Sequence, residues 1–162
     1  MFCEANIIYF HYCSSDQWAG DRSPMFFSSV PYHFRGKKIV LEIVKQVVRS
    51  HQTIKQATRI TLSGDSAGGM GTQLNGDRVG DLLNELLPDA NFDYRMVADS
   101  AWFNPGPSLK NYDCTKTWAC NIEFRTKLGQ NLWNLQPDDS CTEKKGQEKR
   151  WECTFLGMEG VF

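Results

Sequence analysis

The nine-residue stretch Thr61–Gly69, TLSGDSAGG, limits most strongly what this chain can fold into. A β-prone run, Arg59–Ser63, leads into the pattern Gly-x-Ser-x-Gly, and an amphipathic helical pattern follows it. This order is typical of a nucleophile elbow, in which a serine lies on a tight strand-to-helix turn with its Oγ exposed above a sheet. Gly64 and Gly68 have no side chain to obstruct such a turn. We therefore predict that Ser66 is a nucleophile; the alternative is a structural glycine-rich turn.

The elbow also predicts part of an oxyanion hole. The backbone N–H of Ala67 directly follows the serine and would lie at the N-terminal end of the next helix, where hydrogen-bond donors favour negative charge. A serine hydrolase needs in addition a base and an acid, and in α/β-hydrolases Asp or Glu and then His follow the serine along the chain. The three histidines, His11, His33 and His51, all precede Ser66. The sequence thus predicts a nucleophile without its base.

The remaining pattern alternates between strands and helices. This alternation, with short links, predicts an α/β fold of the α/β-hydrolase type, in which helices flank a mostly parallel sheet. We expect one domain over residues 1–162, with the elbow at 64–68. The expected elements are a strand at 6–12, a surface loop at 14–32, a helix at 35–51, a strand at 59–63, a helix at 69–87, a strand at 94–98 and, in a loop-rich C-terminal part, a helix at 123–134.

Overall composition does not favour several classes of partner. The chain has 18 basic and 19 acidic residues and a net charge of -1, which gives no reason to expect nucleic acid or an anionic membrane as a partner. No apolar run approaches the roughly 20 residues of a membrane-spanning helix. No Cys-x-x-Cys or His-rich pattern indicates zinc, and we expect neither a metal nor a cofactor. The first residues do not resemble a signal peptide, so the signal of a secreted protein would lie outside this chain.

The chain carries a series of motifs in a fixed order. They are YCSSDxWxGD at 12–21, FRG at 34–36, the elbow, LNxDRV at 74–79 and ADSAWF at 98–103. In order and spacing, they resemble the motifs of the pectin acetylesterase/Notum family of secreted serine esterases, over nearly the whole chain. The Gly-Asp-Ser-Ala-Gly-Gly pattern alone also suits hormone-sensitive-lipase-type esterases, but these should carry an upstream His-Gly-Gly-Gly segment that this chain lacks.

The resemblance implies a secreted carboxylesterase that hydrolyses O-acyl esters through an acyl-enzyme on Ser66. The implied substrate is a lipidated protein, as in Notum-like palmitoleoyl-protein deacylation, or alternatively an acetylated polysaccharide. In the resembled family the oxyanion-loop glycines come before the first strand seen here, and the catalytic Asp and His come after this chain ends. We therefore expect a fold incomplete at both ends and an inactive fragment. A further alternative is a non-catalytic, truncated relative that acts as an extracellular binding protein.

The resemblance also assigns positions near the site. It places Phe103 and Phe155 on the wall of an acyl pocket, whereas ordinary core packing is the alternative for both. Two departures question a preference for long acyl chains: Thr154 is polar where an aromatic residue is expected, and residues 121–123 lack the usual proline. Asp99 belongs to the ADSAWF motif, which implies a structural role rather than that of the triad acid.

The six cysteines predict disulfides. Cys114 and Cys120 flank a short polar loop, and Cys141 and Cys153 bracket a charged one, so that each pair could reach disulfide distance. We predict these two pairs, with reduced thiols in a cytosolic protein as the alternative. The resemblance implies that the partner of Cys13 lies upstream of this chain.

Overall fold

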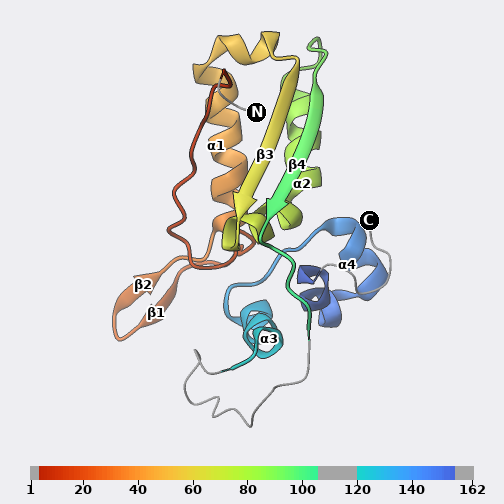
Figure 1. Ribbon diagram of the computed structural model, residues 1–162. Helices are drawn as coiled ribbons and strands as arrows, with labels where there is room; N and C mark the ends of the chain where they lie inside the picture. The colour runs from red at the N-terminus through yellow and green to blue at the C-terminus, as the bar shows by residue number, and fades with distance from the viewer. Residues whose placement is uncertain (1–3, 106–119, 156–162) are drawn as a thin grey trace.

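The computed structural model describes residues 4–105 and 120–155 (Figure 1). Two parallel strands form its centre, β3 (Arg59–Asp65) and β4 (Asp93–Asp99), with Arg59 opposite Asp93 and Asp65 opposite Asp99. The helix α2 (Ala67–Leu86) connects them. A parallel pair joined by a crossover helix is the βαβ unit, and it confirms the α/β class that the alternating pattern predicts.

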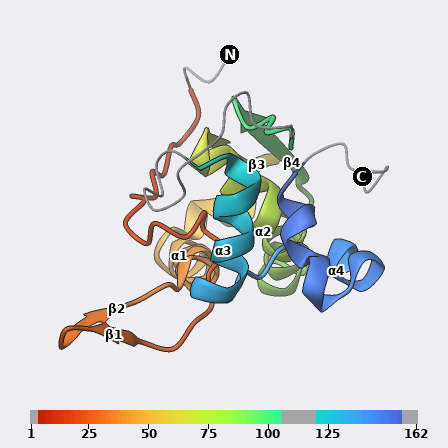
Figure 2. The same ribbon diagram turned by 90° about the horizontal axis from the view of Figure 1, so that it is seen from below.

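Helix α2 covers one face of this sheet, and α1 (Gly36–Ser50) packs beside α2 (Figures 1 and 2). Apolar residues recur every fourth position on both helices, which gives each helix one apolar stripe. The stripes meet in a core that the partly buried side chains Ile60, Leu62 and Tyr94 complete from the strands. Its buried members are Trp18, Val40, Val44, Val48, Val79, Leu83 and Leu87.

The predicted strand at residues 6–12 is not present as a strand. The segment is extended, but it pairs with no other strand in the described part of the chain. Its side chains Ile7 and Tyr9 are 78% and 76% exposed. β-branched and aromatic residues favour extended backbone, yet a strand also needs a neighbour that satisfies its N–H and C=O groups. The sequence therefore predicted a buried strand where none forms, because strand-like residues do not by themselves supply a partner strand.

The predicted surface loop at residues 14–32 is also only partly right. Its second half is a hairpin of β1 (Met25–Phe27) and β2 (Val30–Tyr32), with Phe27 paired to Val30. The intervening Ser28 and Ser29 have φ of 48° and 69°, the left-handed conformations that a two-residue hairpin turn requires. Serines at the turn and a proline in β2 concealed this hairpin, because they are typical of loops.

The C-terminal part is helical. After α3 (Ile122–Leu132) come α4 (Asp139–Lys145) and the 3-10 helix η3 (Gln147–Thr154), and a shorter 3-10 helix, η1 (Gln52–Gln56), follows α1. The predicted helix at 123–134 thus corresponds to α3. The side-chain oxygen of Asn121 accepts the Phe124 N–H at 2.8 Å, and this N-cap sets the start of α3.

One of the predicted disulfides is found. Cys141 and Cys153 are bonded, with their Cα atoms 5.9 Å apart, and link α4 to η3. Cys120 is also disulfide-bonded, but its predicted partner Cys114 lies outside the described residues. Cys13 is an exposed free cysteine.

Among the helices of residues 4–105 and 120–155, none combines the length and apolar character needed to cross a membrane.

Candidate active site

Ser66 lies at the bend between β3 and α2, at the carboxyl end of the two strands (Figure 1). Its φ of 54° and ψ of -113° lie outside the regions that non-glycine residues normally occupy, and its side chain is exposed. Two hydrogen bonds hold the bend: its N–H donates to the Asp99 carbonyl, and its own carbonyl accepts the Met70 N–H, both at 3.0 Å. A strained, exposed serine between a strand and a helix is the geometry of a nucleophile elbow.

Glycines around Ser66 permit this bend, but the positions that require glycine differ from those predicted. A Cβ on Gly64 would stand 2.2 Å from the Gly68 carbonyl oxygen, and one on Gly69 would stand 2.7 Å from the Asp99 carbonyl oxygen. A Cβ on Gly68 would meet nothing within 4 Å. The prediction that Gly68 must lack a side chain is therefore wrong, because it is the backbone of Gly68 that approaches the strand. The steric demand falls on Gly64 and Gly69.

Ala67 is the first residue of α2. The first N–H groups of a helix have no acceptor within the helix, and the turn and loop hydrogen bonds of the described residues do not use the Ala67 N–H. This donor lies directly after Ser66, at the end of α2 where the helix dipole favours negative charge. It is therefore available to an oxygen that becomes negatively charged beside Ser66.

None of the histidines is paired with Ser66. Within the described residues, no imidazole or carboxylate hydrogen-bonds to the Ser66 hydroxyl. His51 follows the end of α1, beside the start of β3 and therefore at the opposite end of the sheet (Figure 1). His33 is exposed after β2, and the His11 ring contacts Tyr9 edge-on, with ring centroids 4.9 Å apart.

Residues after β4 border the elbow. Asp99 contacts Ser66 through its backbone carbonyl, while its carboxylate accepts the Ser100 hydroxyl at 3.1 Å. Ala101 is buried, and a Cβ on Gly69 would lie 2.5 Å from the Ala101 Cβ. Phe103 is half-buried, and its N–H donates to the Ala101 carbonyl at 3.1 Å. The structure thus brings Ser66, Ala67 and the start of the segment that carries Phe103 to one end of the sheet.

Phe155 packs against the C-terminal 3-10 helix η3. It is buried just after η3, and its ring meets Trp151 edge-on with centroids 6.1 Å apart. The hydrogen bonds and ring contacts of the described residues do not join it to Ser66. The neighbouring Thr154 is only 2% exposed, and its hydroxyl has no hydrogen-bond partner in the described structure.

The loop at 14–20 is largely buried, so the prediction of a surface loop is wrong there. The Asp16 carboxylate is fully buried and accepts the Gly36 N–H at 2.7 Å, which binds the loop to the start of α1. The Trp18 carbonyl accepts the Asn75 side-chain amide at 2.9 Å, and a Cβ on Gly71 would collide with the Trp18 ring. The YCSSDxWxGD motif therefore packs against the helix that begins at Ser66. The YCSSDxWxGD motif was the only feature of the sequence that could have indicated this packing.

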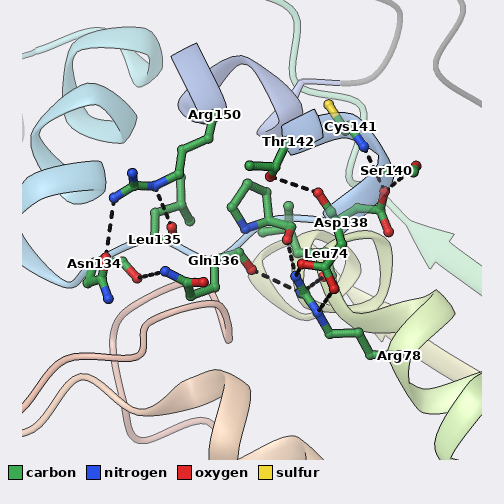
Figure 3. Close-up of polar contacts among 12 residues, drawn as sticks. Leu74, Arg78, Asn134, Leu135, Gln136, Asp138, Ser140, Cys141, Thr142 and Arg150 are labelled. Carbon is green, nitrogen blue, oxygen red and sulfur yellow. Dashed lines mark hydrogen bonds and ion pairs between the residues drawn. The ribbon is translucent and has the colours of Figure 1, made fainter. Parts of the chain in front are cut away.

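Arg78 joins α2 to the segment that leads into α4 (Figure 3). Its guanidinium donates to the Leu74 carbonyl at 2.9 Å, to the Gln136 carbonyl at 3.1 Å and also to the Pro137 carbonyl. It also pairs with the Asp139 carboxylate, an interaction that lowers the pKa of that carboxyl. The Arg78 side chain is only 11% exposed, so its bonds to the three carbonyls are partly shielded from water, whereas the Asp139 carboxylate is 74% exposed.

Two further charged residues, Arg150 and Asp77, lie near the segment that Arg78 holds. The Arg150 guanidinium donates to the Leu135 carbonyl at 2.8 Å (Figure 3). It also donates to the Gln130 carbonyl at 3.1 Å, which ties η3 to α3. The pKa of Asp77 shifts in the opposite direction from that of Asp139. Burial, together with the nearby Asp138 carboxylate, raises it.

Comparisons with known proteins agree with this geometry. The sequence model of the family described as Pectinacetylesterase matches residues 1–157. The chain is 32% identical over 156 residues to the palmitoleoyl-protein carboxylesterase NOTUM of Schmidtea mediterranea, which covers 96% of this chain and 28% of that protein. It is also 32% identical over 151 residues to the protein of that name from Homo sapiens, covering 93% of this chain and 29% of the human one.

A solved structure shares the fold. The crystal structure of the Wnt deacylase Notum from Drosophila matches with a TM-score of 0.74 and 27% sequence identity, over 90% of this chain and 40% of the other. The present chain therefore spans less than a third of the curated relatives named above and less than half of the solved one.

Proposed function

This chain belongs to the pectinacetylesterase family, and we propose on that basis that it is the nucleophile-bearing part of a serine carboxylesterase. In the proposed reaction, the Ser66 Oγ attacks an ester carbonyl, the alcohol leaves, and water hydrolyses the resulting acyl-enzyme. The Ala67 N–H stabilises the negative charge on the former carbonyl oxygen. No metal or cofactor is needed for this chemistry.

One observation carries the proposal: the backbone of Ser66. Strain of this kind persists only where the surrounding structure enforces it, and it is concentrated at functional sites. Here the enforcing contacts are the bond to the Asp99 carbonyl and the close approach of Gly64 and Gly68. Positive φ alone does not distinguish Ser66, because Ser28 and Ser29 also have it in a hairpin turn; the distinguishing feature is its ψ of -113°, which lies outside the left-handed region.

The favoured substrate is a palmitoleoylated or otherwise lipidated protein. Two named relatives are palmitoleoyl-protein carboxylesterases at 32% identity. The half-buried Phe103, on the segment that follows β4, supplies apolar surface for an acyl chain. We assign Phe155 to the same wall, where its ring lies against Trp151.

One observation favours a second candidate, the removal of acetyl groups from a polysaccharide. Thr154 places a buried hydroxyl without a partner beside Phe155. An acetyl group needs only a small recess, and a polar lining residue shortens or interrupts an apolar pocket. The two candidates therefore differ in the acyl length that the site accepts.

We further propose that the 162-residue chain is inactive by itself and that its full-length protein is secreted. Without a positioned imidazole, the serine hydroxyl remains a weak nucleophile at neutral pH. Loss of one triad member can lower kcat by about 10⁴-fold. The Cys141–Cys153 disulfide supports an oxidising compartment.

The test is a chimera in which residues 5–155 replace the matching segment of the human relative. We expect it to hydrolyse p-nitrophenyl octanoate faster than p-nitrophenyl acetate, and Ser66→Ala to abolish both activities. The exposed Ser63, on β3, provides the matched control, because Ser63→Ala should leave both rates unchanged. A folded chimera without Ser66-dependent hydrolysis would contradict the proposal and favour a non-catalytic binding protein. A clear preference for acetate would favour the polysaccharide substrate.

A further inference from the structure

The β1–β2 hairpin exposes apolar side chains on both of its faces. Phe26 is 69% exposed, Phe27 48%, Val30 52% and Tyr32 47%. By the pairing register, Phe27, Val30 and Tyr32 share one face and Phe26 lies on the other. The hairpin projects away from the rest of the described chain in both views (Figures 1 and 2). Several exposed apolar side chains on one small element mark a binding surface more often than scattered single residues do.

The hairpin is shaped in advance. Its three-residue strands are fully paired, and the Phe27 and Tyr32 rings meet edge-on with centroids 5.2 Å apart. A two-stranded hairpin alone in water is only marginally stable, so burial of these side chains in another medium would stabilise it. Little conformational entropy would be lost on binding, because the turn and the ring contact already exist.

The sequence of the hairpin and its base is locally basic, although Asp21 and Glu42 stand at the two ends of the basic stretch. The stretch from Arg22 to Leu41 contains no acidic residue, but it contains four Lys and Arg residues and one His. The whole chain, in contrast, has a net charge of -1. Overall composition therefore gave no reason to expect an anionic surface as partner, whereas the local distribution does. Lys38 contacts Asp21 at 2.8 Å, but its side chain stays 57% exposed.

We propose that the β1–β2 hairpin anchors the protein to the surface of an anionic lipid bilayer. Its aromatic and aliphatic side chains enter the boundary between headgroups and acyl chains, and the basic residues at its base bind the anionic headgroups. The combination favours a bilayer over a soluble polyanion, which would bind the basic residues and leave the apolar ones exposed. The inference does not depend on the esterase proposal.

The position of the hairpin would determine how the protein is oriented on the bilayer. The hairpin lies on the side of the sheet at which β3 and β4 terminate and α2 begins, the side on which α3 and α4 also lie (Figure 1). A hairpin inserted in a bilayer would therefore turn the elbow end of the sheet toward the membrane. Substrates held at a membrane surface would meet the site without a large reorientation of the protein.

The test is sedimentation of the 162-residue chain with phosphatidylcholine vesicles that do or do not contain phosphatidylserine. We expect binding to the anionic vesicles, weaker binding to the neutral ones, and a decrease with added salt. The double substitution Phe26→Ser and Phe27→Ser should lower the partition constant by about tenfold or more, because two large apolar side chains no longer enter the bilayer.

The matched control is the pair Phe124→Ser and Leu128→Ser on α3, which are also exposed, at 38% and 44%. This pair should leave vesicle binding unchanged. Equal loss in both double variants would contradict the proposal, because it would indicate general stickiness of exposed apolar residues. Absence of binding to anionic vesicles would also overturn it and would indicate that the hairpin packs against protein.

Discussion

Replacement of Arg78 by methionine should separate the C-terminal helices from α2. Methionine keeps the apolar stem of the arginine but removes all its donors. The carbonyls of Gln136 and Pro137 then lose the partner that α2 provides (Figure 3), while the Leu74 carbonyl lies within the helix and keeps its helical hydrogen bond. The Cys141–Cys153 disulfide remains, so the helices themselves should persist.

The size of the effect can be worked out from the burial. An unsatisfied buried acceptor costs about 1–3 kcal/mol. Because water partly reaches the Gln136 and Pro137 carbonyls, we expect their combined cost in free energy of unfolding to be about 2–3 kcal/mol. The Asp139 carboxylate adds little, because it is 74% exposed and surface ion pairs contribute under about 1 kcal/mol. The expected decrease of about 2–3 kcal/mol should lower Tm by about 4–12 °C in a domain of this size.

Urea denaturation followed by tryptophan fluorescence measures this decrease. Arg95→Met is the matched control, because its side chain is 67% exposed and pairs only with an exposed Asp93; its midpoint should stay within experimental error of the unmodified chain. Arg78→Lys should fall between the two, since one ammonium cannot reach both carbonyls at once. Equal midpoints for Arg78→Met and Arg95→Met would refute the account of the contact.

The remaining predictions concern the elbow, one carboxylate and the disulfide. Gly64→Ala should lower the free energy of unfolding by about 1–3 kcal/mol or more, because its Cβ would collide with backbone, whereas Gly68→Ala should be tolerated; urea midpoints compare the two. Asp77→Asn should stabilise the chain at neutral pH, because the raised pKa means that the folded state disfavours the ionised carboxylate; the gain should vanish as pH falls through that pKa, and an unfolding series over pH would show a constant gain if this is wrong. Replacing Cys141 and Cys153 by serine should cost about 3 kcal/mol, as expected for a loop of this length, and thermal unfolding with and without reductant would reveal an unchanged Tm if the bond does not stabilise the fold.

Local pattern predicted much of the structure. The positions of α1, α2 and α3 follow from apolar periodicity, and the elbow follows from small residues between a strand and a helix. Both signals lie within short windows of sequence, so they did not depend on what the rest of the chain does. For that reason the sequence placed Ser66 and Ala67 correctly at the junction of β3 and α2.

Features that depend on distant residues could not be read in this way. The segment at 6–12 has strand-like residues, but whether it pairs depends on a neighbour that local pattern does not reveal. The bonds of Arg78 join residues 58 to 61 positions apart, and no periodicity signals them. The hairpin was concealed by serine and proline, which suit a two-residue turn as well as an open loop.

The most direct test of the central claim identifies the residue that becomes acylated. The chimera with residues 5–155 would be incubated with a fluorophosphonate, which bonds covalently to an activated serine, and then digested and mapped by mass spectrometry. The account predicts a single adduct on the peptide that contains Ser66 and none in the Ser66→Ala variant. An adduct on a different serine, or ester hydrolysis that survives Ser66→Ala, would contradict it.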